Sequence, residues 1–439
     1  MRPLVATASL SEIWLSMRRT LFLIPHEIAG LPVFGWGWLF GLIVIAAIVV
    51  TLYQRRLGVR IADFWAQNAA LWAVFTAAVV WLMPAVELLN PSGEPVGLPV
   101  RGYGVMLLSG VVAAVGLAVV RARRYGIGED VVLGIAPWAV VGGILGARAF
   151  YVIEYHDQFF VSDPLTTLRR IVNFTEGGLV VYGAFIGGFS AGTLYVWRRR
   201  LPVLVLGDVV APTMFLGLAL GRIGCLLNGC CYGGVCDDNW TALRFPNGSP
   251  VYLDQLESGL LVGIELSDRR DQIVAVRPGS PAAERGVMPG QAVAQFDPVR
   301  SIEQAEPDRP LEETPYGLLA VIAGVEHYWS AAELPPVAEP VRGTQVLSAL
   351  GGLSLCLGLC LYSRYVHRPG LVMLTGFSGY AIMRFGMEHL RSDEPGQFGT
   401  GLTISQWVSL VVLLASAVGI AWLIKSTAGE PVDRQPLHD

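Results

Sequence analysis

Apolar runs long enough to cross a lipid bilayer recur along this chain and constrain its fold more than any other feature. A spanning helix needs about 20 consecutive apolar residues. Only 15% of the residues are charged, whereas soluble globular proteins carry about 25%. We predict an all-α polytopic membrane protein with about nine transmembrane helices. These helices are expected at residues 34–53, 66–88, 103–120, 131–153, 178–197, 202–221, 344–362, 370–388 and 404–425.

Arginine-rich loops predict how the helices are oriented, because short loops rich in Lys and Arg stay on the cytoplasmic side. Such loops follow the first, third, fifth and seventh predicted helices. They contain Arg55, Arg56 and Arg60; Arg121, Arg123 and Arg124; Arg198 to Arg200; and Arg364 and Arg368. The N-terminus is therefore expected outside and the C-terminus inside. We expect a multi-pass protein of the bacterial inner (plasma) membrane, with segments 89–102, 154–177, 222–343 and 389–403 facing the periplasm.

Residues 235–342 are the one long stretch with a soluble composition. They hold 17 acidic residues against 8 Arg and no Lys, while the rest of the chain holds 18 acidic and 23 basic residues. This distribution agrees with an acidic periplasmic head and a more basic membrane part. The net charge of −4 argues against nucleic acid as a partner.

Part of this head follows a mixed α/β pattern. Segment 263–266 and segment 273–293 predict strand, strand, turn, short helix, glycine stop and strand. The pattern resembles the middle of a PDZ domain, a small fold that binds extended peptides by adding a strand to a sheet edge. We consider two roles for this insertion, namely presentation of a polypeptide substrate or a purely structural element.

Charged side chains inside spanning helices are costly and usually functional, and here they gather at the predicted outer ends. Arg384, Glu388 and Arg391 are spaced to share one helical face. Each arginine alone could simply extend its side chain to the membrane interface. That explanation predicts equally interior charges at the inner helix ends, but there the arginines are expected in loops. Arginine is suited to binding phosphate, so the set predicts a phospholipid headgroup site in the outer leaflet. Its members are Tyr103, Arg148, Tyr182, Arg222, Arg384, Glu388 and Arg391.

Residues 218–233, Leu-Ala-Leu-Gly-Arg-Ile-Gly-Cys-Leu-Leu-Asn-Gly-Cys-Cys-Tyr-Gly, resemble the signature of the prolipoprotein diacylglyceryl transferases. That signature reads roughly Gly-Arg-x-Gly-Asn-Phe-x-Asn-Gly-Glu-x-x-Gly. Four further blocks, at residues 101–106, 142–153, 176–188 and 383–393, resemble other parts of the family in the same order. The resemblance covers residues 98–425 apart from the insertion.

The resemblance implies transfer of a diacylglyceryl group from phosphatidylglycerol to the lipobox cysteine thiol of a prolipoprotein, at the membrane lipid and without a cofactor or metal. It implies that Arg222 and Arg384 hold the phosphate and that Tyr182 occupies the position of the thiol-activating residue. The implied substrate-binding residues are Tyr103, Arg148, Asn228, Gly229, Glu388 and Arg391, with Glu388 orienting the arginines.

Three residues depart from the family pattern. Tyr182 stands where the family usually has His, and Cys225 and Cys230 replace the first Asn and the Glu of the signature. We therefore keep open a non-catalytic relative that binds lipid or lipoprotein. A transporter is a third hypothesis, but transport predicts polar or broken helices that continue to the inner face.

Four cysteines, Cys225, Cys230, Cys231 and Cys236, fall within twelve residues. One or two disulfides are expected there, since the periplasm is oxidising. A zinc site is the alternative, although the spacing lacks the usual Cys-x-x-Cys pairs. We expect Cys356 and Cys360 to be packing residues.

We divide the chain into five regions. Residues 1–97 form an N-terminal extension with two extra helices, 98–234 the first part of the transferase core, and 235–342 the head. Residues 343–425 form the second part of the core and 426–439 a cytoplasmic tail.

Overall fold

The computed structural model describes residues 19–160, 163–173, 178, 180–267, 269–304, 306–390 and 399–426. It contains two compact units. The first comprises Met1–Val105 and Gly224–Gly343, and the second Met106–Ile223 and Thr344–Asp439. Two long helices cross the unit boundaries, α5 (Gly102–Arg124) and α10 (Val203–Asn228).

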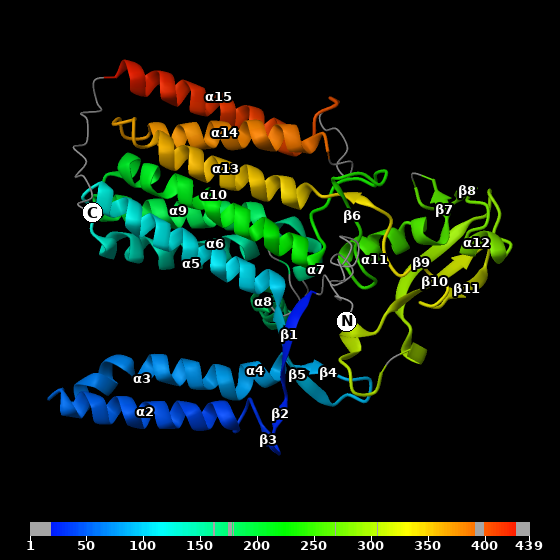
Figure 1. The fold of residues 1–439 in the computed structure, drawn as a ribbon, viewed down its shortest axis with the longest axis horizontal. Coiled ribbons are helices and arrows are strands. Elements are labelled where there is room, and N and C mark those ends of the chain that lie inside the picture. Colours follow the sequence, from blue (N-terminus) through cyan, green and yellow to red (C-terminus); the bar gives the residue numbers. More distant parts are fainter. Residues whose placement is uncertain are drawn as a thin grey trace, which may run out of the picture. The chain divides into compact units, whose positions relative to one another are not determined.

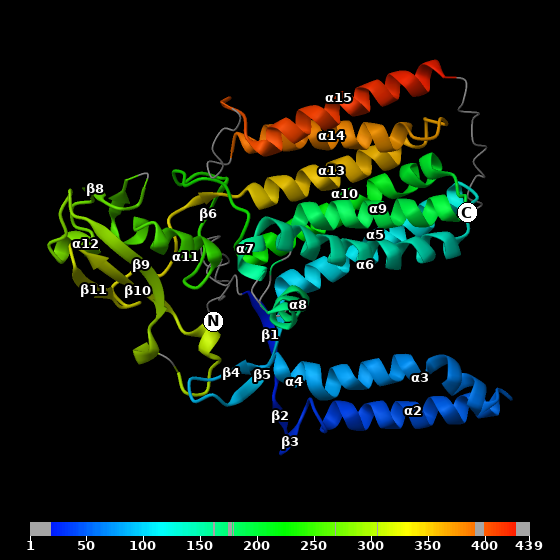
Figure 2. The same cartoon turned by 180° about the vertical axis from the view of Figure 1, so that it is seen from behind.

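Helices occupy all nine predicted ranges (Figures 1 and 2). Besides α5 and α10, these helices are α2 (Trp38–Arg56), α3 (Ile61–Ala77), α6 (Glu129–Glu154), α9 (Val181–Arg198), α13 (Thr344–Tyr362), α14 (Leu371–Glu388) and α15 (Ile404–Lys425). Within the described residues, seven helices are long and apolar enough to cross a membrane, and α9 and α14 are not among these seven. The chain is thus a polytopic membrane protein, and the count of nine spans stays a prediction.

The long helices of the second unit run side by side in both views (Figures 1 and 2). Glycines bring α6 and α9 into backbone contact. A Cβ atom on Gly146 would lie 2.4 Å from the carbonyl oxygen of Gly183, and one on Gly187 would lie 2.3 Å from that of Gly142. Small residues four apart allow such close approach between membrane helices. The glycines in two of the family-like blocks therefore shape the bundle.

A buried polar cluster joins α5, α10 and α14. Asp208, 1% exposed, accepts hydrogen bonds of 2.8 Å from the backbone N–H groups of Gly370 and Met373 at the start of α14. Gly370 has no side chain to cap that helix, so a carboxylate from α10 does so. Arg121, 3% exposed, donates to the carbonyl oxygens of Asp208 and Val209.

Five arginines that we expected in loops lie in the last turns of α2, α5 and α9, namely Arg55, Arg56, Arg123, Arg124 and Arg198. Our placement of Arg121 in a loop was also wrong. It lies in the last turn of α5 and is buried among polar backbone atoms. The helix ends that were predicted to face the cytoplasm therefore also carry an interior charge, and the gathering of charge at the predicted outer ends is less exclusive than the sequence suggested.

In the first unit, α2 and α3 form an antiparallel pair (Figure 1). Beside them lies an antiparallel sheet in the order β1 (Thr20–Pro25), β5 (Pro95–Arg101) and β4 (Leu88–Leu89). A second small ribbon pairs β2 (Glu27–Ile28) with β3 (Leu31–Pro32). A short helix, α4 (Met83–Ala85), precedes β4.

The insertion also belongs to the first unit. It contains α11 (Pro250–Glu257), β7 (Ile264–Leu266), β8 (Ile273–Val276), α12 (Pro281–Glu284), β9 (Val293–Arg300), β10 (Tyr316–Ile322) and β11 (Val325–Trp329). β7 pairs with β8, and a second sheet has the order β11-β10-β9. Two further short strands, β6 (Ala242–Leu243) and β12 (Val341–Arg342), pair where the insertion begins and ends. The predicted order of strand, strand, short helix, glycine and strand is present, with Gly286 at φ 74° after α12. The PDZ assignment itself stays a prediction.

The cap from Asp208 predicts a stability effect. Asp208→Ala leaves the first N–H groups of α14 without acceptors in an apolar bundle, so we expect a loss of about 1–2 kcal/mol or more. Thermal unfolding in detergent, followed by circular dichroism, measures it. The matched control is Asp63→Ala, since the Asp63 side chain is 60% exposed and its loss should cost within about 0.5 kcal/mol. Equal melting temperatures for the two variants would contradict the assignment.

Candidate functional site

The second unit contains a small cavity between α10, α13 and α14. Two of the predicted phosphate-binding arginines line it, Arg222 from α10 and Arg384 from α14. The other lining residues are Leu218, Thr344, Ser348, Tyr380, Met383 and Met387. The cavity measures about 10 Å³, which is room for roughly one water molecule. Side chains must therefore move apart before a phosphate enters.

Arg384 is held in place by two neighbours. Its guanidinium lies 2.6 Å from the Glu388 carboxylate, one helical turn along α14, and it donates a 2.8 Å hydrogen bond to Ser405 Oγ of α15. The Glu388 side chain is only 2% exposed. A buried carboxylate is tolerated when a charge partner compensates its lost hydration. The pair therefore holds Arg384 in place. The predicted role of Glu388 in orienting both arginines for substrate stays a prediction, and sequence reasoning missed Ser405.

Arg222 has a different environment. It is half-buried, and within the described part of the chain no hydrogen bond or ion pair to it is found. A guanidinium has five N–H donors, and those of Arg222 border the cavity without a carboxylate that neutralises them. Of the two arginines, Arg222 is the one more available to an incoming anion.

Arg148 lies elsewhere in the second unit and does not line this cavity. It is 6% exposed and donates to the backbone carbonyls of Arg170, Ile171, Asn173 and Gly178 at 2.7 to 3.1 Å. It thus joins α6 to the end of α8 (Pro164–Val172) and the segment that leads to α9. In this structure the Arg148 guanidinium binds backbone carbonyls at the end of α8 and before α9.

Asn228 and Gly229 belong to the first unit and end α10. Gly229 has φ 71°, its N–H donates to the Leu226 carbonyl, and the Cys230 N–H donates to the Cys225 carbonyl. This is the Schellman arrangement, in which a left-handed residue, usually glycine, closes a helix. Gly229 thus makes a tight turn, and α10 continues past its predicted end at residue 221.

A polar cavity of about 250 Å³ borders this turn within the first unit. Asn228 lines it and accepts a 3.2 Å hydrogen bond from Arg19 Nε. Arg101 lines it too, paired through both guanidinium nitrogens with Glu312 of the insertion. Burial raises the pKa of Glu312, but the hydrogen bond and charge of Arg101, together with the charges of Arg19 and Arg300, lower it more, so the net pKa lies below its usual value. Arg101 stood in a family-like block, but Arg19 and Glu312 carried no sequence signal.

The remaining predicted residues are described only in part. Tyr103 lies in the first turn of α5 and is 40% exposed. Tyr182 lies in the first turn of α9, but its side chain is outside the described part, and so is Arg391.

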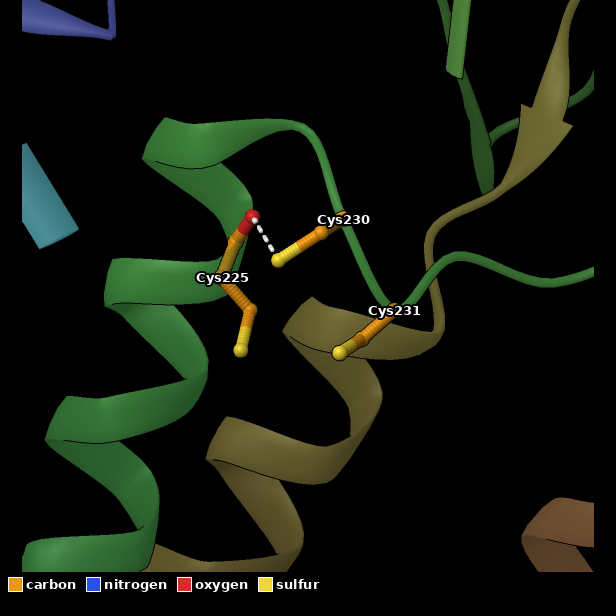
Figure 3. A group of neighbouring side chains, drawn as sticks. All are labelled: Cys225, Cys230 and Cys231. Atoms are coloured by element: carbon orange, nitrogen blue, oxygen red, sulfur yellow. Dashed lines mark hydrogen bonds between the residues drawn. The ribbon is translucent and has the colours of Figure 1, made fainter. Parts of the chain in front are cut away.

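The expected disulfides are not present, since all six cysteines are thiols. Instead, the Sγ atoms of Cys225, Cys230 and Cys231 lie within 4.8 Å of one another (Figure 3). Cys236 is not part of this group. Cys356 is buried in a cluster with Phe215, Leu359 and Val372, which confirms its packing role.

Comparison with known proteins points to one family. Residues 94–422 match the family model described as prolipoprotein diacylglyceryl transferase. A phosphatidylglycerol-prolipoprotein diacylglyceryl transferase of Rhodopirellula baltica is 42% identical, over 92% of this chain and 88% of its own length. A second enzyme of that name, from Clostridium perfringens, is 34% identical over 73% and 90%, and one from Burkholderia cenocepacia is 26% identical over 78% and 98%. With this match over most of its length, the chain belongs to the prolipoprotein diacylglyceryl transferase family.

Proposed function

We propose that this protein transfers a diacylglyceryl group from phosphatidylglycerol to the lipobox cysteine thiol of prolipoproteins. The names of its relatives give the two substrates. The observation that carries the proposal is the pair Arg222 and Arg384, which line one cavity in a membrane bundle. Two guanidinium groups in an apolar bundle need an anionic partner, and the buried Glu388 carboxylate pairs with Arg384 and, among the described residues, not with Arg222.

The reaction displaces one group at a glyceryl carbon. The cysteine sulfur attacks the carbon that carries the phosphodiester oxygen, a C–S bond forms, and the C–O bond breaks. Glycerol phosphate leaves with the electron pair of that bond, and the thiol proton passes to a base. Negative charge therefore grows on the phosphate as the bond breaks.

Arg222 and Arg384 stabilise that growing charge in our proposal. Donors that are already in place and shielded from water stabilise a transition state more than flexible donors in water do. Glu388 and Ser405 hold Arg384 before substrate binds, while Arg222 has its donors available at the cavity. Arg384 is thus held in position before the phosphate arrives, and Arg222 is able to adjust to it.

Tyr182 is our candidate for the base, from its position in the sequence alone. A phenol with a reference pKa of about 10 is a weaker base at pH 7 than an imidazole. Nearby guanidinium groups would favour the phenolate. Tyr103, Asn228, Gly229 and Arg391 are kept as proposed substrate-binding residues.

Arg148 also stays a proposed site residue, but with an indirect role. We propose that it acts through Gly178, whose carbonyl it binds and which lies shortly before α9 and Tyr182.

We infer nine spans, with α9 and α14 added to the seven. α9 is in backbone contact with α6 along its glycines, and α14 lies between α13 and α15 (Figures 1 and 2). The arginine-rich loops then place the C-terminal ends of α10 and α14, which carry Arg222 and Arg384, at the periplasmic side of the inner membrane. The PDZ-like insertion is proposed to face the same side and to contact the prolipoprotein.

The transfer assay tests the function directly. Purified protein in detergent is given phosphatidylglycerol and a lipobox peptide, and the thioether product is measured by mass spectrometry. Binding of both substrates without any thioether product would favour a non-catalytic relative. Phosphatidylglycerol movement across vesicles without product would favour a transporter.

Arg222→Ala should lower transfer at least about 100-fold, because one donor group to a developing anion commonly contributes that much. Arg222 has no described partner that its removal would leave unpaired, so the melting temperature should change little. The matched control is Arg123→Ala, an exposed arginine at the other end of the bundle, which should keep its activity. Normal turnover in Arg222→Ala would remove this residue from the site.

Arg384 needs a gentler change, because alanine there would leave Glu388 buried and unpaired. Arg384→Lys keeps the charge but loses the planar fork. We expect folded protein with transfer reduced at least about tenfold.

Tyr182→Phe tests the base. We expect a loss of about 100-fold, the size of a typical general-base contribution. Tyr182→His should restore activity and extend it to lower pH, because imidazole titrates near 6.5. Full activity in Tyr182→Phe would show that the hydroxyl is not the base.

A further inference from the structure

Three thiols meet at the end of α10. Cys225 lies in the last turn of the helix, and Cys230 and Cys231 follow the closing glycine, Gly229. Figure 3 shows the Cys231 side chain directed toward Cys225 and the Cys230 thiol directed toward the Cys225 carbonyl oxygen, to which it donates at 3.8 Å. Each pair of Sγ atoms lies within 4.8 Å, and all three side chains are partly buried.

The backbone is folded in the way that this convergence requires. Gly229 reverses the chain, and the Cys230 N–H donates back to the carbonyl of Cys225, so residues 230 and 231 come to lie over the last helical turn. Cys231 itself has φ 59°, a left-handed conformation that few residues other than glycine adopt. Such conformations persist where the surroundings impose them, commonly at ligand sites.

The chemistry of three thiols favours a metal ion over a disulfide. One disulfide would leave the third sulfur without a bonded partner. Zn–S bonds of about 2.3 Å in a tetrahedron place sulfur atoms about 3.8 Å apart, so the three Sγ atoms need only small side-chain rotations to share an ion. Thiolate ligands select zinc and monovalent copper over harder ions.

We propose that Cys225, Cys230 and Cys231 bind one thiophilic metal ion, Zn²⁺ or Cu⁺, through three thiolates. Among the described residues, no His, Asp or Glu joins the group as a fourth ligand. Three thiolates complete a trigonal Cu⁺ site, whereas Zn²⁺ would keep one position for water or substrate. Binding releases the thiol protons, so affinity should fall as the pH is lowered.

This inference does not depend on the transferase activity. The metal would tie the turn to the helix end and so fix Asn228, which lies between Cys225 and Cys230. Two of the three ligands are residues that depart from the family signature, so the site would be a property of this chain and its similar relatives.

Metal titration of the full-length protein tests the proposal. The protein is reduced, stripped of metal and titrated in detergent with Zn²⁺, and without oxygen with Cu⁺, against chromophoric chelators. We expect one ion per chain, and Co²⁺ should give thiolate-to-metal absorption. Tighter binding in one arm identifies the metal. Failure to bind Zn²⁺ or Cu⁺ at micromolar concentration would overturn the proposal.

Serine variants identify the ligands. Metal binding should weaken more than about 100-fold in each of the variants Cys225→Ser, Cys230→Ser and Cys231→Ser. Even loss of a residue that only hydrogen-bonds to a ligand commonly lowers metal affinity about 10–100-fold. Cys236→Ser is the matched control, and we expect its affinity within about twofold of the parent protein. Equal loss in the control, or unchanged affinity in any of the three variants, would contradict the assignment.

A measurement on the unmodified protein covers the case in which a variant fails to fold. Bound metal should protect Cys225, Cys230 and Cys231 from alkylation, located by peptide mass spectrometry, and leave Cys236 reactive. A disulfide between any two of the three cysteines in protein isolated without reductant would overturn the proposal.

Discussion

The ion pair between Arg384 and Glu388 is the interaction on which the proposed site depends. An isolated carboxylate in an apolar bundle would take up a proton, and an isolated guanidinium would be very costly to bury. Together they allow a permanent positive group to remain inside the bundle, with Ser405 satisfying a further donor. The adjacent Arg222 then adds a second charge that the carboxylate does not cancel. The result is a local excess of positive charge among largely apolar helices.

The helical part of the fold could be predicted from the sequence because its cause is local. Apolar runs of bilayer length mark helices, and all nine predicted ranges are helical, with α13 and α15 at the predicted bounds. The strands β1, β4 and β5 were not predicted. β4 and β5 form a short local hairpin in a segment without a strand pattern, and the pairing of β1 with β5 joins residues far apart in sequence. Hydropathy carries no information about such partners.

The site was predictable to a similar degree. The spacing of Arg384 and Glu388 indicated their pairing, and the shared cavity of Arg222 and Arg384 followed from their placement at helix ends. Arg148 shows the limit of this reasoning. Its charge and depth matched the others, but its donors go to the carbonyls of Arg170, Ile171, Asn173 and Gly178. A sequence gives the charge of a side chain and not the direction in which it points. The cysteines show the same limit, since their spacing did not reveal the turn at Gly229 that brings three of them together.

One helix, α10, carries the Asp208 cap, Arg222 and the first thiol of the cysteine group without interruption. A helix advances about 1.5 Å and turns about 100° with each residue. Adding or deleting a single residue between Arg222 and Gly229 would rotate the following residues about the helix axis by that angle. The turn at Gly229 would then start from a different face of the helix. The length of this stretch is therefore as constrained as its composition, and loops elsewhere in the chain are where insertions such as residues 235–342 can be accommodated.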